Sequence, residues 1–502
     1  MIQAPSLGQA PPAREAVTDA LKAAYDAYLY VGRPCGNSHP AHVATIAALL
    51  GHDAPDPATA RVLEIGCGDG GNLVPMAAAL PGASFVGIDL APRAIGEARA
   101  FASAIGLRNV AFHDADLRDL PAGDGPFDYV VAHGFYSWVP EPVRLAMFET
   151  IQARLAPRGV AFVSHNVLPG CGLRRMVWDV LKPHVAGIED PVARIAEART
   201  MAAKMGEAMT QQPGLASAIA IEFREIAERP GFAVLHDDLA AVNHPVLLRD
   251  IVAEGASHGL AWIGDADLFR HPAPAFGDAM NAYLAASDRL TREHVIDHLR
   301  LRRYRESLFV RDGVTKPAAP DARLLAPMHA AATNTTVERH GAQQDRGTPP
   351  LQRALIERLV DVHPGSLPIA ELVELIVARA GAGSPLAIRD NALLLLLNAA
   401  YAGVIVPLAA PAGIALKPSE RPSAFAPARW QVSRHDFVVN RRHDGVAFTD
   451  PVMRALLPLL DGTRDREALV AALASVAPAM RDPRRALDDY LAHFARLGIL
   501  DA

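Results

Sequence analysis

Lysine is nearly absent from this chain of 502 residues, whereas acidic side chains are plentiful. Arginine provides almost all of the 49 basic side chains, which stand against 55 acidic ones, and the net charge is −6. A mildly acidic chain does not bind nucleic-acid phosphates along its whole surface, so we expect no nucleic-acid partner unless a local basic patch exists. We attribute the shortage of lysine to a GC-rich genome. The five lysines are Lys22, Lys182, Lys204, Lys316 and Lys417.

Cysteine is also scarce, and long apolar runs are missing. The three cysteines are widely spaced and form no C-x-x-C pair; they are Cys35, Cys67 and Cys171. We therefore expect no disulfide framework, no zinc site and no other metal site. The N-terminus lacks a positive segment followed by an apolar one, which argues against a signal peptide. The longest apolar run, around residues 392–397, is far shorter than the roughly 20 residues that span a bilayer. We therefore expect a cytoplasmic protein with no membrane partner.

Residues 61–90 have the pattern of a strand, a glycine-rich loop, a helix and a second strand. Gly66, Gly68 and Gly70 occupy alternate positions, and glycine lets a backbone turn sharply and approach a ligand closely. Asp89 closes the second strand, where a carboxylate can accept hydrogen bonds from both hydroxyls of a ribose. The stretch therefore predicts a cofactor that carries a ribose.

Two cofactors satisfy this pattern. The glycines at positions 66, 68 and 71 also match the dinucleotide pattern, and Asp89 lies near the roughly 20-residue spacing of a NAD ribose acid. Glu64 favours S-adenosylmethionine (SAM), because a carboxylate repels a pyrophosphate but suits the ammonium group of a methionine moiety. The series from Glu64 through the glycines to Asp89 resembles the signature of class I SAM-dependent methyltransferases.

Strands and helices continue to alternate after Asp89. Short apolar runs at 109–113, 127–132 and 159–165 predict three more strands, and the segments 92–105 and 140–155 predict the helices between them. Five strands separated by helices predict an α/β fold with a parallel, doubly wound sheet. Ligands of such sheets bind beyond the carboxyl ends of the strands.

Three clusters of polar and aromatic residues follow the later strands. In Asp114–Leu117, Asp116 is placed to accept a hydrogen bond from an adenine amino group, although a solvated turn is an equal alternative. His133–Pro140 is rich in aromatics at the place where a target group would meet the sulfonium, with core packing as the alternative. His165–Gly170 follows the fifth strand.

Segments along the whole chain add a more specific resemblance. Ser38–Pro40, His133–Pro140 and Ser164–Gly170 together look like a bacterial family of protein lysine methyltransferases, including those that modify rickettsial outer-membrane protein B. Residues 236–260 resemble the methyltransferase regulatory domain, and residues 457–469 resemble the C-terminal domain of that family. The family usually has an aromatic residue where this chain has Cys171.

The resemblance implies a SAM-dependent methyltransferase that N-methylates lysine side chains of a protein or peptide acceptor. A lysine amine must lose its proton before it accepts a methyl group, and His133, Tyr136 or water could take that proton. We assign to the cofactor site Glu64, Gly66, Gly68, Gly70, Asn72, Asp89, Leu90, Asp116, Leu117 and His133. We assign to catalysis and acceptor binding Tyr136, Trp138, His133 and Asn166.

The length predicts two or three domains. We expect a Rossmann-like, seven-stranded class I core whose last two strands form an antiparallel pair, with a helical insertion that acts either as a lid or as a buttress. A C-terminal α+β domain of winged-helix type completes the chain. The expected divisions are 1–60 (helical preface), 61–185 (SAM-binding core), 186–314 (helical regulatory insertion with the last core strands), 315–349 (linker) and 350–502 (winged-helix-like domain).

Two other functions fit the same residues. The chain could methylate a peptide or small-molecule natural product, with the C-terminal domain holding a leader segment. It could instead sense SAM and bind DNA through the winged helix, against which the mild acidity counts. The sequence leaves the oligomeric state open, with a homodimer as one option.

Overall fold

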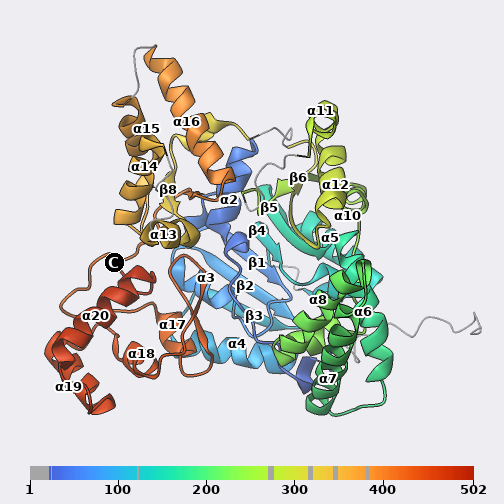
Figure 1. Ribbon diagram of the computed structural model, residues 1–502, viewed down its shortest axis with the longest axis horizontal. Coiled ribbons are helices and arrows are strands. Elements are labelled where there is room, and N and C mark those ends of the chain that lie inside the picture. The colour runs from blue at the N-terminus through green and yellow to red at the C-terminus, as the bar shows by residue number, and fades with distance from the viewer. Residues whose placement is uncertain are drawn as a thin grey trace, which may run out of the picture.

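The central sheet of this computed structural model has seven strands (Figure 1). The structure describes residues 22–23, 25–120, 124–269, 276–314, 320–342, 349–379 and 384–502. The strand order is β3-β2-β1-β4-β5-β7-β6, and β7 runs antiparallel to both of its neighbours. This confirms the predicted class I core and its antiparallel final pair. The strands are β1 Arg61–Ile65, β2 Ser84–Asp89, β3 Val110–Asp114, β4 Phe127–Ala132, β5 Leu155–Asn166, β6 Leu260–Asp265 and β7 Tyr304–Arg311.

Helices cover both faces of the sheet because successive side chains of its buried strands point to opposite faces. On β4, Tyr129 and Val131 belong to the apolar core under α2, α3 and α4, whereas Val130 and Ala132 belong to the core under α5 and α10. His39 accepts a hydrogen bond from the Ala41 N–H and caps α2. These helices are α2 Pro40–Leu49, α3 Leu73–Ala79, α4 Pro92–Ala104, α5 Glu141–Arg154 and α10 Leu248–Ser257.

The expected helical insertion follows β5 and has its own apolar core, which begins with α6, before the predicted boundary at residue 186. Its helices are α6 Gly170–His184, α7 Pro191–Thr210 and α8 Leu215–Glu228, and a short helical turn, η5 Val234–Asp238, closes it. Asp238 is fully buried under this turn and accepts hydrogen bonds from Trp178, Arg174 and Arg229 at 2.9–3.0 Å. These contacts fix η5 against α6.

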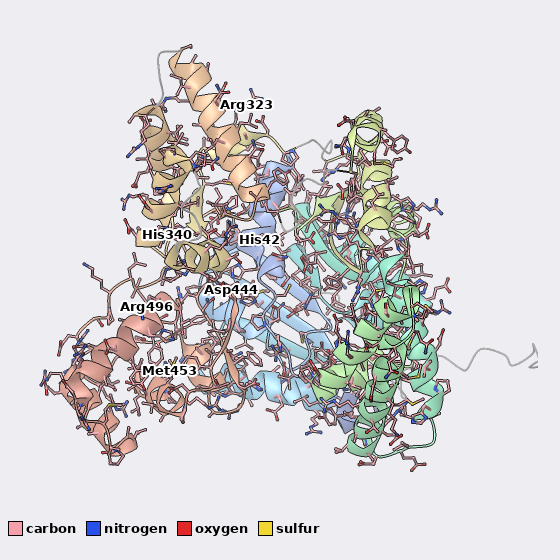
Figure 2. The ribbon with its side chains drawn as sticks, viewed as in Figure 1. His42, Arg323, His340, Asp444, Met453 and Arg496 are labelled. Carbon is pink, nitrogen blue, oxygen red and sulfur yellow. The ribbon has the colours of Figure 1, made fainter. Side chains whose placement is uncertain are left out.

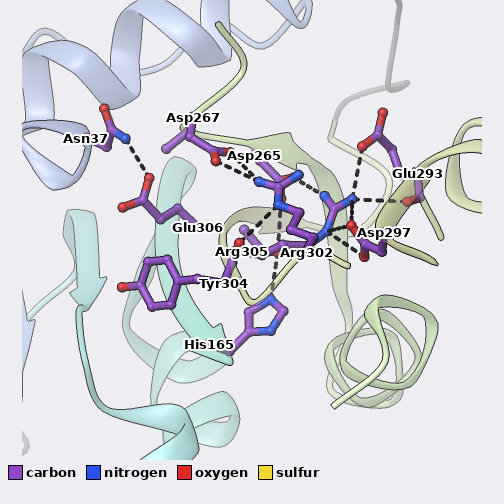
Figure 3. Close-up of polar contacts among 12 residues, drawn as sticks. Asn37, His165, Asp265, Asp267, Glu293, Asp297, Arg302, Tyr304, Arg305 and Glu306 are labelled. Atoms are coloured by element: carbon purple, nitrogen blue, oxygen red, sulfur yellow. Dashed lines mark hydrogen bonds and ion pairs between the residues drawn. The ribbon is translucent and has the colours of Figure 1, made fainter. Parts of the chain in front are cut away.

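A buried ion cluster joins β6 and β7 to the helix α12 Arg289–Arg300, which follows α11 Asp278–Ala286 in the chain (Figure 3). Arg305 is inaccessible to solvent and donates to Asp297 at 2.8 Å, to Glu293 at 3.0 Å and to Asp265. The adjacent Arg302 donates to Asp267 at 2.6 Å. Removing one partner of such a cluster leaves an uncompensated buried charge, so the cluster holds the sheet edge as a unit.

The segment 315–349 is not a linker where the structure describes it, so this prediction is wrong for residues 320–342. They form η6 Ala322–Leu325, β8 His329–Ala332 and α13 Asn334–Gly341. Strand β8 lies between β10 Ile405–Leu408 and β9 Leu367–Pro368 in a second sheet, and its residues 330–332, all alanines, are fully buried. Residues 315–319 and 343–348 of the predicted linker lie outside the described residues.

The composition of β8 explains why the sequence does not predict it. A short run of alanines has the small-residue composition of a linker. The partners of this strand come from much later in the chain, since His329 pairs with Pro368 of β9 and Ala332 pairs with Ile405 of β10. The strand therefore depends on pairing between distant segments, which local composition does not reveal.

The C-terminal region has two apolar cores instead of the single domain predicted for 350–502. The first core belongs to β8, β9, β10 and three helices, and it includes Leu49 of α2. The second core belongs to residues 424–500. In Figure 1 the two units lie at the upper left and the lower left of the sheet. The helices of the first unit are α14 Pro350–Asp361, α15 Ile369–Val377 and α16 Pro385–Tyr401.

The second unit, which we call the C-terminal unit, packs against the methyltransferase-like core. Trp430 lies in helix α17 and stacks on Phe101 of α4 with the ring centroids 3.9 Å apart. Strands β11 and β12 form an antiparallel hairpin. The elements of this unit are α17 Ala426–Gln431, β11 Phe437–Val439, β12 Gly445–Ala447, α18 Pro451–Leu456, η7 Leu457–Leu459, α19 Arg466–Val476 and α20 Pro483–Arg496.

None of the helices in the described ranges is both long and apolar enough to cross a bilayer. The same ranges hold no group of three or more His, Cys, Asp or Glu side chains arranged to bind a metal ion.

Candidate functional site

A cavity of about 270 Å³ lies at the carboxyl ends of the central strands, where a doubly wound sheet binds its ligands. Its walls come from the loops after β1, β2, β3 and β4, from the N-terminal preface and from the insertion. Nine of the ten residues assigned to the cofactor from sequence contribute to the lining, and these are Glu64, Gly66, Gly68, Asn72, Asp89, Leu90, Asp116, Leu117 and His133.

The glycine loop after β1 needs its glycines for two different reasons. Gly66, Gly68 and Gly70 all have positive φ, between 53° and 75°, which other residues rarely adopt. A Cβ on Gly66 would come within 2.7 Å of the Phe135 ring at the cavity wall. Gly70 instead faces away from the cavity, where a Cβ would come within 2.9 Å of Val74. Gly70 therefore allows the loop to pack on α3, and it is not among the described residues that line the cavity.

Asp89 holds this loop in place. Its Oδ2 accepts the N–H of Gly68 and its Oδ1 accepts the N–H of Ala91, both at 2.9 Å. Burial raises the pKa of Asp89 above its ordinary value. Each carboxylate oxygen has a second lone pair, so the side chain can brace the loop and still accept hydrogen bonds from a ribose.

Glu64 presents a carboxylate to the cavity. The side chain is 2% exposed, and its Oε1 accepts a hydrogen bond from Asn72 Nδ2 at 2.7 Å. Among the described residues, Glu64 Oε2 has no hydrogen-bond partner. Burial raises the pKa of Glu64 to about 7. A buried carboxylate oxygen of this kind fits the ammonium group of a methionine moiety and would repel a pyrophosphate.

Asp116 lines the cavity and is paired with a neighbouring arginine. Its carboxylate accepts the backbone N–H of Arg118 at 3.0 Å and also pairs with the Arg118 guanidinium, with Nε at 2.7 Å. The pair caps the short helix η3 Leu117–Asp119 at the cavity wall. The hydrogen bond from Asp116 to an adenine amino group stays a prediction.

His133 lies in the cavity wall with a partner that the sequence patterns did not reveal. Its Nδ1 lies 3.3 Å from the hydroxyl of Tyr304, at the start of β7. Burial lowers the pKa of His133 below its ordinary value, so the ring is neutral at pH 7. A neutral imidazole beside the cavity can accept a proton.

Of the other residues assigned to the acceptor side, only Trp138 lines the cavity. Tyr136 is 1% exposed and belongs to the apolar core under α5, where its hydroxyl donates to Glu254. The two aromatics point in different directions because residues 136–138 form a tight helical turn. The prediction that Tyr136 lies beside the target amine is therefore wrong.

Asn166 is not among the lining residues that the structure describes. Its Nδ2 donates to Asn243 Oδ1 at 3.1 Å, and its backbone N–H donates to Ser137 at 2.9 Å. Both contacts join β5 to neighbouring loops. Asn166 thus supports the loop that carries Trp138. The structure does not place the Asn166 side chain at the cavity, where it could contact the acceptor directly.

The preface and the insertion add lining residues that sequence reasoning missed. Tyr25 stacks on His236 of the insertion with the ring centroids 4.8 Å apart, and His236 Nε2 lies 2.6 Å from the carbonyl oxygen of Tyr28. The rings of Tyr25 and His236 line the cavity, as do Tyr30 and Asp237. Burial raises the pKa of Asp237 to about 7. The run of tyrosines before residue 32 was the available sequence signal for this part of the cavity wall. His236 lies 208 positions beyond Tyr28, so no local pattern links the two.

Three family models match the chain in order. A methyltransferase domain matches residues 62–159, and a predicted methyltransferase regulatory domain matches residues 232–311. A C-terminal winged helix domain, described as that of PKMT, matches residues 420–480. These matches confirm the predicted resemblance and the order of its parts.

Known proteins share parts of the sequence and nearly the whole fold. Uncharacterized protein RP789 of Rickettsia prowazekii (strain Madrid E) is 30% identical over 289 residues, which cover 57% of this chain and 52% of that protein. The chain therefore matches about half the length of this relative. PKMT2 from Rickettsia typhi has a TM-score of 0.82 at 19% identity, over 94% of this chain and 99% of its own. The same protein in complex with AdoHcy has a TM-score of 0.81.

The site and the family models agree on the type of donor. The methyltransferase domain model covers the glycine loop, Asp89 and His133, and Glu64 Oε2 supplies an acceptor for an ammonium group. Together they indicate SAM as the methyl donor and leave no place for the pyrophosphate of NAD beside Glu64.

Proposed function

We propose that this chain is a SAM-dependent methyltransferase that transfers methyl groups to lysine side chains of a protein. The observation that supports SAM as the methyl donor is Glu64 Oε2, a buried carboxylate oxygen at the cavity with no hydrogen-bond partner in the described part of the chain. When bound, SAM supplies a methyl group activated by a positively charged sulfur. Glu64 would bind the ammonium group of SAM, and Asp89 would bind its ribose. Leu90 and Leu117 would pack against the faces of its adenine.

For a lysine to accept the methyl group, its side-chain amine must first lose its proton. His133 would take that proton, because its ring is neutral and lies at the cavity wall. The tautomer with the proton on Nδ1 donates to the Tyr304 oxygen and leaves Nε2 as the proton acceptor. Before it loses its proton, the lysine ammonium would lie against the Trp138 ring, and such cation–π contacts contribute about 0.5–2 kcal/mol. The apolar wall of the cavity also lowers the pKa of an amine that enters it.

A protein as acceptor is supported by the two domains that accompany the core. The winged helix model carries the name PKMT, an abbreviation used for protein lysine methyltransferases, and the chain shares the fold of PKMT2 from Rickettsia typhi. A DNA-binding regulator is disfavoured, because the tip of the β11–β12 hairpin is buried against the core: His443 is 3% exposed. Methylation of a peptide or small natural product differs from the proposal only in the acceptor.

Label transfer separates these acceptors. Purified full-length protein is incubated with methyl-labelled SAM and a bacterial lysate, and label is counted separately in the protein and small-molecule fractions. We expect label in the protein fraction, stable to base as an N-methyl group is, and at least about tenfold less label with His133→Asn. Label confined to small molecules would contradict the proposal.

A further inference from the structure

The hairpin of the C-terminal unit reaches the donor site. Strands β11 and β12 are joined by residues 440–444, and Asp444 lies where the unit meets the core (Figure 2). At the tip, His443 has a φ of 62°, a conformation that costs energy for a residue with a Cβ. The tip is braced from inside, because Asn440 Oδ1 accepts the N–H groups of Arg442 and Asp444 at 2.9 Å.

His443 contacts a residue of the donor site. Its Nε2 lies 2.8 Å from Asn72 Oδ1, and the two residues are 371 positions apart in the chain. The direction of this hydrogen bond follows from the neighbours of Asn72. Asn72 Oδ1 also accepts the backbone N–H of Cys35 at 2.8 Å, which fixes the oxygen on that side of the amide. His443 Nε2 must therefore carry a proton and donate.

The other side of the Asn72 amide holds Glu64. Asn72 Nδ2 donates to Glu64 Oε1 at 2.7 Å and to Ser38 Oγ at 3.1 Å. All four hydrogen-bonding positions of this amide are thus filled, by the preface, by β1 and by the C-terminal unit. Reversing the amide would break the contacts with the Cys35 N–H and with the Glu64 carboxylate. The donor from His443 helps to fix the orientation in which Asn72 holds the carboxylate.

We infer that the C-terminal unit positions the donor site, with His443 acting through Asn72 on Glu64. This inference rests on the proposed use of Glu64 to bind the SAM ammonium group. A second contact joins the same unit to the cavity wall: the Arg33 guanidinium lies 4.5 Å from the centroid of the Phe437 ring on β11, and Arg33 lines the cavity. Docking of the C-terminal unit and donor binding must then strengthen each other by the same factor, because binding linkage is reciprocal.

The test is direct calorimetric binding of S-adenosylhomocysteine, which carries the same ammonium group, to the full chain. His443→Asn keeps a residue that tolerates positive φ but is too short to reach Asn72. His443→Gln can place an amide N–H on Asn72 Oδ1. The matched control is His493→Asn, the same replacement in the same unit, on helix α20.

We expect the dissociation constant of H443N to rise about 3- to 10-fold, with H443Q between H443N and wild type and H493N within about twofold of wild type. In the background of Asn72→Ala, H443N should have no further effect, because the residue through which His443 acts is gone. The KM of the protein acceptor should not change. A merely structural role would weaken binding equally in both backgrounds.

Three results overturn the inference. Binding by H443N equal to wild type excludes a role for the contact, and an equal loss in the Asn72→Ala background excludes a role through Asn72. If H443N melts at a lower temperature than wild type, the affinity of H443Q tests the contact instead. An affinity of H443Q lower than that of H443N would also exclude the contact. A wild-type chain that binds no S-adenosylhomocysteine would instead overturn the proposed function itself.

Discussion

Replacing Glu64 by glutamine should stabilise the ligand-free protein and weaken donor binding. Glutamine has the same shape, and its oxygen can still accept the hydrogen bond from Asn72 Nδ2. The variant loses only the charge that burial makes costly. The two effects have opposite signs, so a general disturbance of the fold cannot imitate them.

The stability effect follows from the pKa of Glu64. The folded protein raises this pKa from 4.5 to about 7. Between these values the folded chain keeps a proton that the unfolded chain has lost, so wild-type stability falls as the pH rises through this window. A shift of this size corresponds to about 3 kcal/mol above pH 7. Thermal melts of E64Q and wild type should differ by several degrees at pH 8 and by much less at pH 5.5.

The binding effect follows from the lost charge. Hydrogen bonds to charged groups contribute about 1.5–3 kcal/mol, so E64Q should bind S-adenosylhomocysteine about 10- to 150-fold more weakly at pH 7. Wild-type affinity should fall below pH 7 as Glu64 becomes protonated, whereas E64Q affinity should change little there. Calorimetry measures both. A variant that melts lower than wild type at pH 8, or binds equally well, would refute this account of Glu64.

Four further substitutions test other parts of the structure. Asp89→Ala should weaken donor binding at least about tenfold by calorimetry and also lower the melting temperature, because two backbone N–H groups lose their acceptor. Trp138→Ala should lower kcat much more than donor affinity in a steady-state assay. Tyr136→Phe should lower the unfolding free energy by about 1–3 kcal/mol and leave kcat unchanged. Asp297→Asn should destabilise the fold by about 3–5 kcal/mol, because Arg305 keeps a buried charge with fewer partners.

Each of these has a result that contradicts it. Unchanged donor affinity in the Asp89 variant would remove this side chain from the site. Equal losses of turnover and donor affinity in the Trp138 variant would place its ring in the core. A large loss of turnover in Tyr136→Phe would restore that residue to the acceptor side, and a melting curve like that of wild type for Asp297→Asn would show that the ion cluster contributes little.

The sequence predicts the core because its signals are local. Pro92 begins α4, and an acid closes β2 at the place where the sheet binds ligands. The residues that end parallel strands meet at one edge of the sheet, so Glu64 and Asp89 could be assigned without the structure.

What the sequence does not predict depends on contacts between distant segments. Whether Tyr136 or Trp138 faces the cavity depends on the phase of one tight turn, which composition does not reveal. His443 meets Asn72 across 371 positions. The alanines of β8 resemble a linker until their partner strands are in place.

The central claim is that methyl groups pass from SAM to lysine side chains of a protein, and peptide mapping tests it most directly. Lysate proteins are incubated with the full chain and methyl-labelled SAM, digested, and sequenced by tandem mass spectrometry. We predict labelled methyl groups on lysine Nζ atoms with wild type and almost none with E64Q at limiting SAM. Labelled methyl groups on other side chains only, or on no protein at all while small molecules become labelled, would contradict the account.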